Sequence, residues 1–397
     1  MKTIYVLLVL QVSFGVLAQP PATSYNSDWS AFVQEVDTTY PFFDLKKIRP
    51  DWDGAKPELE KRVAACTSDS EFLGIVVDGF RVLRDSHMQL SDAKVTPPAL
   101  APEFFPGIGF MSAADRRVIV MATDPKLGEI AKVGTEIVQI NGTNAYEFLE
   151  KRVEEDWKKS ASSSPQRARL YTYRMPLRGK QGDTFSVRYR SGTEEKDATL
   201  TCDVEARGWP HVYNMPNDLV RVGRSFLYKK LDNGVGYIYM RRVDPSVVDG
   251  MREAFSKITD ATGWIVDLRG NGGGGYDDAL INQIKEMPKP VAVIIDAGCI
   301  SAGETLARDF AQYAGARIFG TKSAGSSSSK RQWKFPSGIA TVTMATRSRW
   351  RADGQPIEFN GIDPDVIVEP VPEEVQQGKN TEILRAEEYL LSATGKR

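Results

Sequence analysis

The sequence predicts an α/β protein in which a helical N-terminal region and a β-rich domain precede an α/β core. Three observations support this prediction. From Asp28 to about Ser91, apolar residues recur at the spacing of amphipathic helices. Between residues 116 and 190, three short segments alternate apolar and polar residues, as strands with one buried face do. From Gly234 onward, strand-like and helix-like segments alternate, which is typical of a parallel sheet covered by helices.

The composition is that of a soluble globular protein. The chain has 397 residues, of which 41% are hydrophobic and 26% are charged, and its formal net charge is -1. This length is sufficient for two or three domains, each with its own core. The near-neutral charge gives no electrostatic reason to expect nucleic acid or an anionic membrane as a partner. Oligomer formation is left open.

The N-terminus has the pattern of a secretory signal. One Lys and a short apolar run are followed by the small-residue sequence Val16-Leu17-Ala18 before Gln19. The apolar run is too short for a membrane span. We therefore expect an exported protein, either periplasmic or extracellular, that begins near Gln19 after cleavage.

The patterns divide the chain into five segments. Within the β-rich domain, the charged sequence LEKRVEEDWKK is interpreted as the exposed face of a helix. The core ends with a predicted hairpin, RQWKF and IATVTMATRSRW, and a C-terminal amphipathic helix, TEILRAEEYLL. The predicted segments are a signal peptide (1–18), an N-terminal helical region (19–95), a β-rich domain (96–205), a linker (206–233) and the α/β core (234–397).

A run of four glycines lies between a predicted strand and a predicted helix, in GWIVDLRGNGGGGYD. Gly270, Gly272 and Gly275 match the dinucleotide-binding pattern GxGxxG, with Asp296 at the end of the next strand. The loop, however, follows a charged strand end, and too little chain follows it for a second nucleotide-binding half. We therefore expect no cofactor. Glycines also allow backbone N–H groups to approach a substrate carbonyl, and this use suits the run better.

Ser301, in CISAGE, allows two interpretations. With Glu304 three residues later it forms a capping box, so Ser301 could be only a helix N-cap. A Ser at a helix N-terminus, one strand after a glycine loop, is also well placed to be a nucleophile, because free N–H groups there can hold an oxyanion.

The three cysteines lie far apart and lack metal-ligand spacing, so no metal site is expected. In an exported chain two of Cys66, Cys202 and Cys299 could form a disulfide, but the sequence does not select a pair. Cys299 precedes Ser301 by two residues and is interpreted as a small buried hydrophobic residue rather than a nucleophile.

Several ordered motifs together resemble the tail-specific, or C-terminal-processing, serine peptidase family. The tricorn core and the retinoid-binding interphotoreceptor proteins are more distant relatives. The resemblance extends from about Asp28 to the C-terminal helix and implies a ClpP/crotonase-like core, an N-terminal helical region and an inserted PDZ-like domain. The motifs are DWD (51–53), LRDSHMQL (83–90), PGIGF (106–110), GYIYM (236–240), DLRGNGGG (267–274), SAGE (301–304) and GIDPD (361–365).

The resemblance implies a serine endopeptidase that forms an acyl-enzyme on Ser301 and needs no metal or cofactor. In the better-known branch of the family, a Lys in G-K-G is the general base. Aligning Gly320 and Gly325 with that pattern places Ser326 at the Lys position and Lys330 where Gln usually stands. The usual Ser–Lys dyad is therefore missing, although a Ser needs an adjacent base to become a good nucleophile.

His is the commonest general base, and the chain contains two. His211 lies in the linker and is expected to have a surface or packing role. By resemblance to the tricorn-like branch, Ser86, His87, Ser301 and Glu358 form a tetrad with His87 as the base. The logic is that of a Ser-His-Asp triad. Alternatives remain for two members: Lys322 or Lys330 for the base, and Asp363 or Asp365 for Glu358.

Two further groups of residues follow from the resemblance. The pattern N-x-G-G, in which x is often Pro and so lacks an N–H, makes Gly273 the expected oxyanion donor, together with Ala302. Gly107, Ile108, Gly109 and Phe110 are expected to bind the C-terminus of a protein or peptide substrate, as PDZ domains do. The alternative for these four is a β-turn before a strand.

A catalytically silent peptide- or lipid-binding relative is the alternative function. The missing Lys keeps this alternative open, whereas the presence of Ser301, His87 and the glycine loop favours the peptidase.

Overall fold

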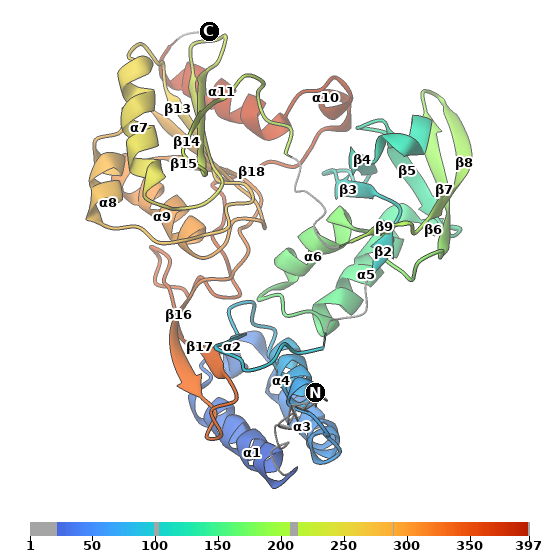
Figure 1. The fold of residues 1–397 in the computed structure, drawn as a ribbon. Coiled ribbons are helices and arrows are strands. Elements are labelled where there is room, and N and C mark those ends of the chain that lie inside the picture. The colour runs from blue at the N-terminus through green and yellow to red at the C-terminus, as the bar shows by residue number, and fades with distance from the viewer. Residues whose placement is uncertain (1–21, 99–102, 207–212, 289, 396–397) are drawn as a thin grey trace, which may run out of the picture.

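The computed structural model describes residues 22–98, 103–206, 213–288 and 290–395, which form three parts (Figure 1). A helical region lies at one end, a β domain at a second and an α/β core at the third. The predicted signal sequence, 1–18, and His211 lie outside the described residues. Within the described ranges, no helix is long and apolar enough to cross a membrane, and no group of His, Cys, Asp and Glu has the arrangement of a metal site.

The helical region forms around large aromatic side chains. Trp29, Phe32, Trp52 and Phe72 are buried in its core, as the predicted helical periodicity requires. Ser68 caps the last helix by accepting a hydrogen bond from the Glu71 N–H at 3.3 Å. The helices are α1 (Ala22–Thr39), α2 (Phe43–Lys46), α3 (Arg49–Ala64) and α4 (Asp69–Val82).

The predicted C-terminal hairpin does not pack on the core. Its strands β16 (Ser328–Lys334) and β17 (Thr341–Ser348) join β1 (Gln89–Ser91) in a three-stranded sheet, in the order β1-β17-β16. Phe335 of the hairpin is buried among the aromatic side chains of the helical region, and Figure 1 shows β16 and β17 beside these helices. A late segment of the chain thus ties the helical region to the core.

The β domain contains a six-stranded antiparallel sheet whose main path is β3-β4-β5-β7-β8, with β6 paired to β5. The charged sequence LEKRVEEDWKK is helical, as predicted, and buries Leu149 and Val153 against the sheet. Its elements are β2 (Phe104–Phe105), β3 (Ile108–Ser112), β4 (Val118–Thr123), the 3-10 helix η1 (Pro125–Ala131), β5 (Glu136–Ile140), β6 (Thr143–Asn144), α5 (Ala145–Lys159), α6 (Pro165–Arg174), β7 (Thr184–Ser191), β8 (Glu194–Thr201) and β9 (Val204–Glu205).

The core is a seven-stranded sheet in the order β10-β11-β12-β13-β14-β15-β18, parallel from β12 onward. This confirms the predicted α/β alternation. Side chains on each central strand alternate between two faces: Val266 faces α7, α8 and α9, whereas Ile265 faces α11. The elements are β10 (Val220–Val222), β11 (Phe226–Lys230), β12 (Gly236–Met240), α7 (Ser246–Lys257), β13 (Trp264–Asp267), α8 (Asp278–Lys285), β14 (Val291–Ile295), α9 (Ala302–Ala314), β15 (Arg317–Gly320), β18 (Val366–Ile367), α10 (Pro372–Gln376) and α11 (Thr381–Ala393).

The three cysteines are free thiols and all are buried. Cys299 is fully buried, and this burial raises the pKa of its thiol well above the usual value. A thiol in this state is a poor nucleophile, in agreement with the interpretation of Cys299 as a core residue.

Candidate active site

Ser301 lies in a strained turn between β14 and α9. Its backbone has φ 55° and ψ −121°, in a region that residues with a Cβ rarely adopt. Two acceptors hold this conformation: the Ser301 N–H donates to the Ser326 carbonyl at 2.8 Å and to the Glu304 carboxylate at 3.2 Å. Of the capping box predicted from S-x-x-E, the hydrogen bond from the Ser301 N–H to the Glu304 side chain is therefore present. The Ser301 residue is partly exposed beside the glycine loop.

The glycine loop contacts Ser301 through Gly273. This residue has φ +70°, and a Cβ added to it would lie 2.8 Å from the Ser301 Cβ. The Gly273 N–H, the expected oxyanion donor, instead donates to the Asn271 side chain at 2.9 Å. Within the described parts of the chain, the N–H groups of Gly274 and Ala302 have no acceptor. In this conformation the Gly273 N–H is thus engaged by Asn271, and the role of Gly273 as oxyanion donor stays a prediction.

Glu304 connects Ser301 to the loop that follows β15. Its carboxylate is fully buried and accepts hydrogen bonds from the Ser323 hydroxyl at 2.7 Å, the Gly325 N–H at 2.7 Å and the Ser326 N–H at 2.9 Å. Burial raises the pKa of this carboxyl to about 8. The sequence pattern indicates only a helix cap for Glu304, because its partners in the loop lie about twenty residues away.

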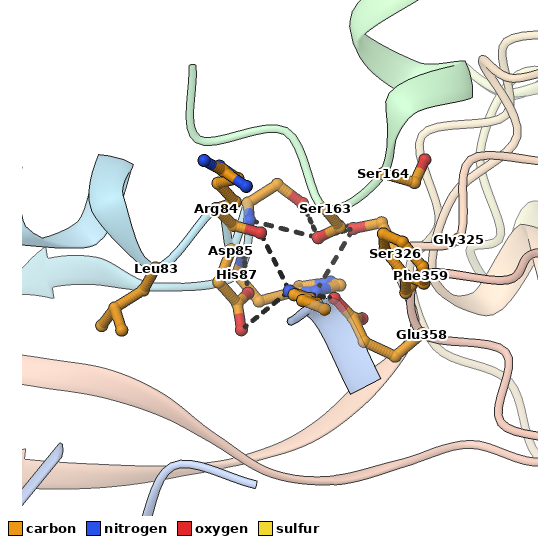
Figure 2. A network of polar contacts seen from close by, with 12 residues as sticks. Leu83, Arg84, Asp85, His87, Ser163, Ser164, Gly325, Ser326, Glu358 and Phe359 are labelled. Atoms are coloured by element: carbon orange, nitrogen blue, oxygen red, sulfur yellow. Dashed lines mark hydrogen bonds and ion pairs between the residues drawn. The ribbon is translucent and has the colours of Figure 1, made fainter. Parts of the chain in front are cut away.

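Ser326 joins His87 to the Ser301 turn. Its hydroxyl lies 3.4 Å from the His87 Nδ1 and shares a hydrogen bond of 2.5 Å with the Ser86 hydroxyl, while its carbonyl accepts the Ser301 N–H (Figure 2). The position that holds a Lys base in the better-known branch thus holds a link between the two halves of the site. Ser163, which no sequence pattern singled out, lies 3.2 Å from the Ser86 hydroxyl and 3.4 Å from that of Ser326.

The His87 ring is suited to accept a proton. Burial and, to a smaller extent, the positive charge of Lys330 lower the pKa of His87 to about 4, although the charge of Asp85 opposes this shift. The imidazole is therefore neutral near pH 7. Its Nδ1 faces Ser326, and its Nε2 has no hydrogen-bond partner in the ranges that the structure describes.

Glu358 lies in the same cluster but contacts a different partner from the one expected. Its Oε1 forms an ion pair with Lys46 at 2.9 Å, and its Oε2 accepts the Ser327 N–H at 2.9 Å. Among the described residues it has no hydrogen bond to His87 or Ser86. A direct orienting bond to the imidazole is therefore not present, because the carboxylate is held by Lys46 and the loop.

Comparison with known proteins finds a family to which the core is similar. Residues 234–287 and 280–368 match the model of peptidase family S41. This part of the chain is similar to peptidase family S41. A probable CtpA-like serine protease of Staphylococcus haemolyticus is 23% identical over 263 residues, which are 55% of this chain and 49% of that protein. A carboxy-terminal-processing protease of Bartonella bacilliformis is 33% identical over 146 residues, 35% of this chain and 32% of that protein.

The resemblance predicted from the motifs is thus confirmed for residues 234–368, although the chain matches half or less of the length of these relatives. Among solved structures, mature CPAF superimposes with a TM-score of 0.61 at 12% identity, over 94% of this chain and 96% of that one. Mature CPAF complexed with lactacystin gives a TM-score of 0.60 at 12% identity, over 94% and 98%. At this identity the likeness describes the fold, including the N-terminal helices.

Three of the four alternative residues are engaged by other partners. Exposed Lys322 pairs with Asp363 at 2.9 Å, and Asp365 accepts the Ile318 N–H at 2.8 Å. Lys330 has no ion-pair partner in the described parts, and its charge acts on His87. Lys330 therefore remains the alternative base with a position close to the site.

The residues expected to bind a peptide are buried. Ile108 and Phe110 belong to the hydrophobic core of the β domain, at 0% and 1% exposure. A Cβ added to Gly109 would lie 2.9 Å from the Arg174 carbonyl, because the end of α6 lies against β3. Gly107 is likewise buried, beside Asp124. In this conformation the four residues pack within the β domain and present no open groove.

Proposed function

We propose that this chain is a serine endopeptidase in which Ser301 is the nucleophile and His87 the general base. The observation that carries the proposal is the position of Ser326, which contacts the His87 ring with its hydroxyl and the Ser301 N–H with its carbonyl. Two side chains more than two hundred residues apart are thereby held at one loop. The strained turn at Ser301 and the glycine loop beside it support the same role.

The chemistry follows from these positions. The Ser301 hydroxyl attacks the peptide carbonyl while His87 Nε2 takes its proton. The negative charge that develops on the carbonyl oxygen is held by the free N–H groups of Ala302 and Gly274. His87 then gives the proton to the departing amine, leaving an acyl-enzyme on Ser301. A water molecule, deprotonated by the same imidazole, releases the new carboxylate and restores the hydroxyl.

An active-site serine probe tests this proposal. We expect a fluorophosphonate to label the wild-type protein at Ser301, as mass spectrometry of the labelled peptide would report. Ser301→Ala and His87→Ala should lose labelling, whereas His211→Asn should keep it. A folded wild-type protein that is not labelled would exclude the acyl-enzyme and favour the silent peptide- or lipid-binding relative.

The substrate side of the proposal concerns export and the β domain. We propose that the protein acts outside the cytoplasm on protein or peptide substrates. We also propose that the β domain, which contains PGIGF and has β3 as an edge strand, is PDZ-like. Binding a substrate C-terminus there requires α6 to move away from Gly109. Cleavage of a peptide with a free terminal carboxylate should then be faster than cleavage of its amidated form. Equal rates would leave the β domain without this role.

A further inference from the structure

Lys46 is a buried cation next to the candidate active site. It is the last residue of α2, and its side chain has 0% exposure. The ammonium lies 2.9 Å from Glu358 Oε1 and 3.9 Å from Asp85 Oδ2, and it donates to the Arg84 carbonyl at 2.8 Å and the Tyr40 hydroxyl at 3.2 Å. A charge with no solvent contact is costly unless its partners are well placed, and here it has four.

These contacts join the two chain segments that carry the site. On one side, Lys46 contacts the Arg84 carbonyl and the Asp85 carboxylate. Asp85 in turn accepts a hydrogen bond from the backbone N–H of His87 at 2.9 Å. On the other side, it holds Glu358, whose second oxygen accepts the Ser327 N–H. Figure 2 shows Asp85 and His87, which belong to one segment, next to Glu358, which belongs to the other.

We propose that Lys46 is a positioning residue for the active site: its ammonium keeps Glu358 ionised and fixes the segment that carries His87 against the Ser326–Ser327 loop. The inference rests on the proposed function. Lys46 touches neither substrate nor the reacting atoms, and it acts on His87 through Asp85 and Glu358.

The electrostatic part of the inference follows from the groups around Glu358. Burial raises the pKa of Glu358, and the charge of Lys46 is the largest influence that lowers it. Loss of an adjacent cation raises the pKa of a carboxyl, because the ionised form loses its attraction to that charge. Without Lys46, the pKa of Glu358 is therefore expected to rise further. The charged and titratable groups that face Glu358 are Lys46, Asp85, Tyr40, Lys330, Glu304 and the neighbouring His87.

The test replaces Lys46 and follows both labelling and ionisation. Lys46→Met removes the charge, Lys46→Arg keeps it, and Lys56→Met is the matched control, since Lys56 pairs with Asp37 and Asp53 in the same helical region. The first readout is the rate of fluorophosphonate labelling against pH. The second is the NMR titration of the His87 ring, which is readily assigned because the chain has only two His and His211→Asn identifies the other.

For Lys46→Met, we expect labelling to fall most at acidic pH and to recover as the pH rises, because the ionised fraction of a carboxyl below its pKa increases about tenfold for each step of one in pH. We also expect an additional inflection in the His87 titration. Lys46→Arg should retain most of the labelling, Lys56→Met should match the wild type, and Lys46→Met combined with Glu358→Gln should lack the inflection.

A Lys46→Met profile that is merely scaled down at every pH, with no additional inflection, would overturn the inference and leave Lys46 a packing residue. An unfolded Lys46→Met is replaced by Lys46→Gln, to which the same criteria apply. If the wild type is not labelled but the inflection appears, the proposed peptidase activity fails while the ionisation of Glu358 by Lys46 stands. The two failures are thus distinguishable.

Discussion

Substitution of Gly273 by Ala tests whether the glycine loop fixes the position of Ser301. The added Cβ would lie 2.8 Å from the Ser301 Cβ and 3.0 Å from the Ile300 carbonyl oxygen. Carbon atoms in contact are ordinarily about 3.5–4.0 Å apart, so Ser301 or the loop must move by about 0.7 Å or more. The φ of +70° adds a backbone cost of about 1–2 kcal/mol for a residue with a Cβ.

The expected effect is larger on reaction than on folding. A misplacement of about 1 Å in a reacting group lowers the rate about 100-fold. We therefore expect Gly273→Ala to slow fluorophosphonate labelling by about 10- to 100-fold while the free energy of unfolding falls by about 1–3 kcal/mol. Labelling kinetics and denaturant unfolding measure the two quantities on the same sample.

Gly275→Ala is the matched control in the same run. A Cβ on Gly275 meets no atom within 4 Å, and its φ lies outside the left-handed region. This variant should label and unfold like the wild type. The reasoning is refuted if Gly273→Ala is labelled as fast as Gly275→Ala, because the loop would then not determine where Ser301 lies.

Three further predictions concern the residues around this turn. Because burial lowers the pKa of His87 to about 4, labelling should persist well below pH 6.5. The free energy of unfolding should fall as the pH drops from about 6.5 toward 4, because in this range the unfolded chain binds a proton that the folded chain does not. In a series of unfolding curves, His87→Gln should remove this pH dependence. Ser326→Ala removes the hydroxyl beside the imidazole and should slow labelling about tenfold, a loss of about 1.4 kcal/mol, whereas Ser328→Ala, at a hydroxyl without a partner in the described ranges, should not. Glu304→Gln places an amide where the carboxylate accepts hydrogen bonds from several donors. The free energy of unfolding should therefore fall by about 1–3 kcal/mol, and labelling should slow. An unchanged melting temperature would contradict this.

Much of the fold could be predicted because local periodicity reports which side of an element is buried. The alternation after Gly234 indicated the parallel sheet, and the charged helix α5 keeps two apolar residues on its inner face. The place where the β16–β17 hairpin packs could not be predicted in this way. Its alternating pattern requires a buried face but does not say which part of the molecule covers it.

The residues of the candidate site also divide into those that a local sequence pattern reveals and those that it does not. Ser301, His87 and the glycine loop could be proposed from motifs, since each lies in a short motif whose chemistry is specific. Ser163 and Lys46 could not, because a Ser in a polar loop and a Lys at a helix end are ordinary until distant partners are known. Burial of the GIGF segment was also beyond the sequence, because the helix end that lies against it follows more than sixty residues later.

The ion pair between Lys46 and Glu358 has a consequence for the order of events during synthesis. A ribosome releases the helical region long before it polymerises the segment with which that region pairs. The nascent chain therefore carries His87 for most of its translation without the loop that completes its surroundings. The contact between His87 and Ser326 can therefore form only after most of the chain has been synthesised.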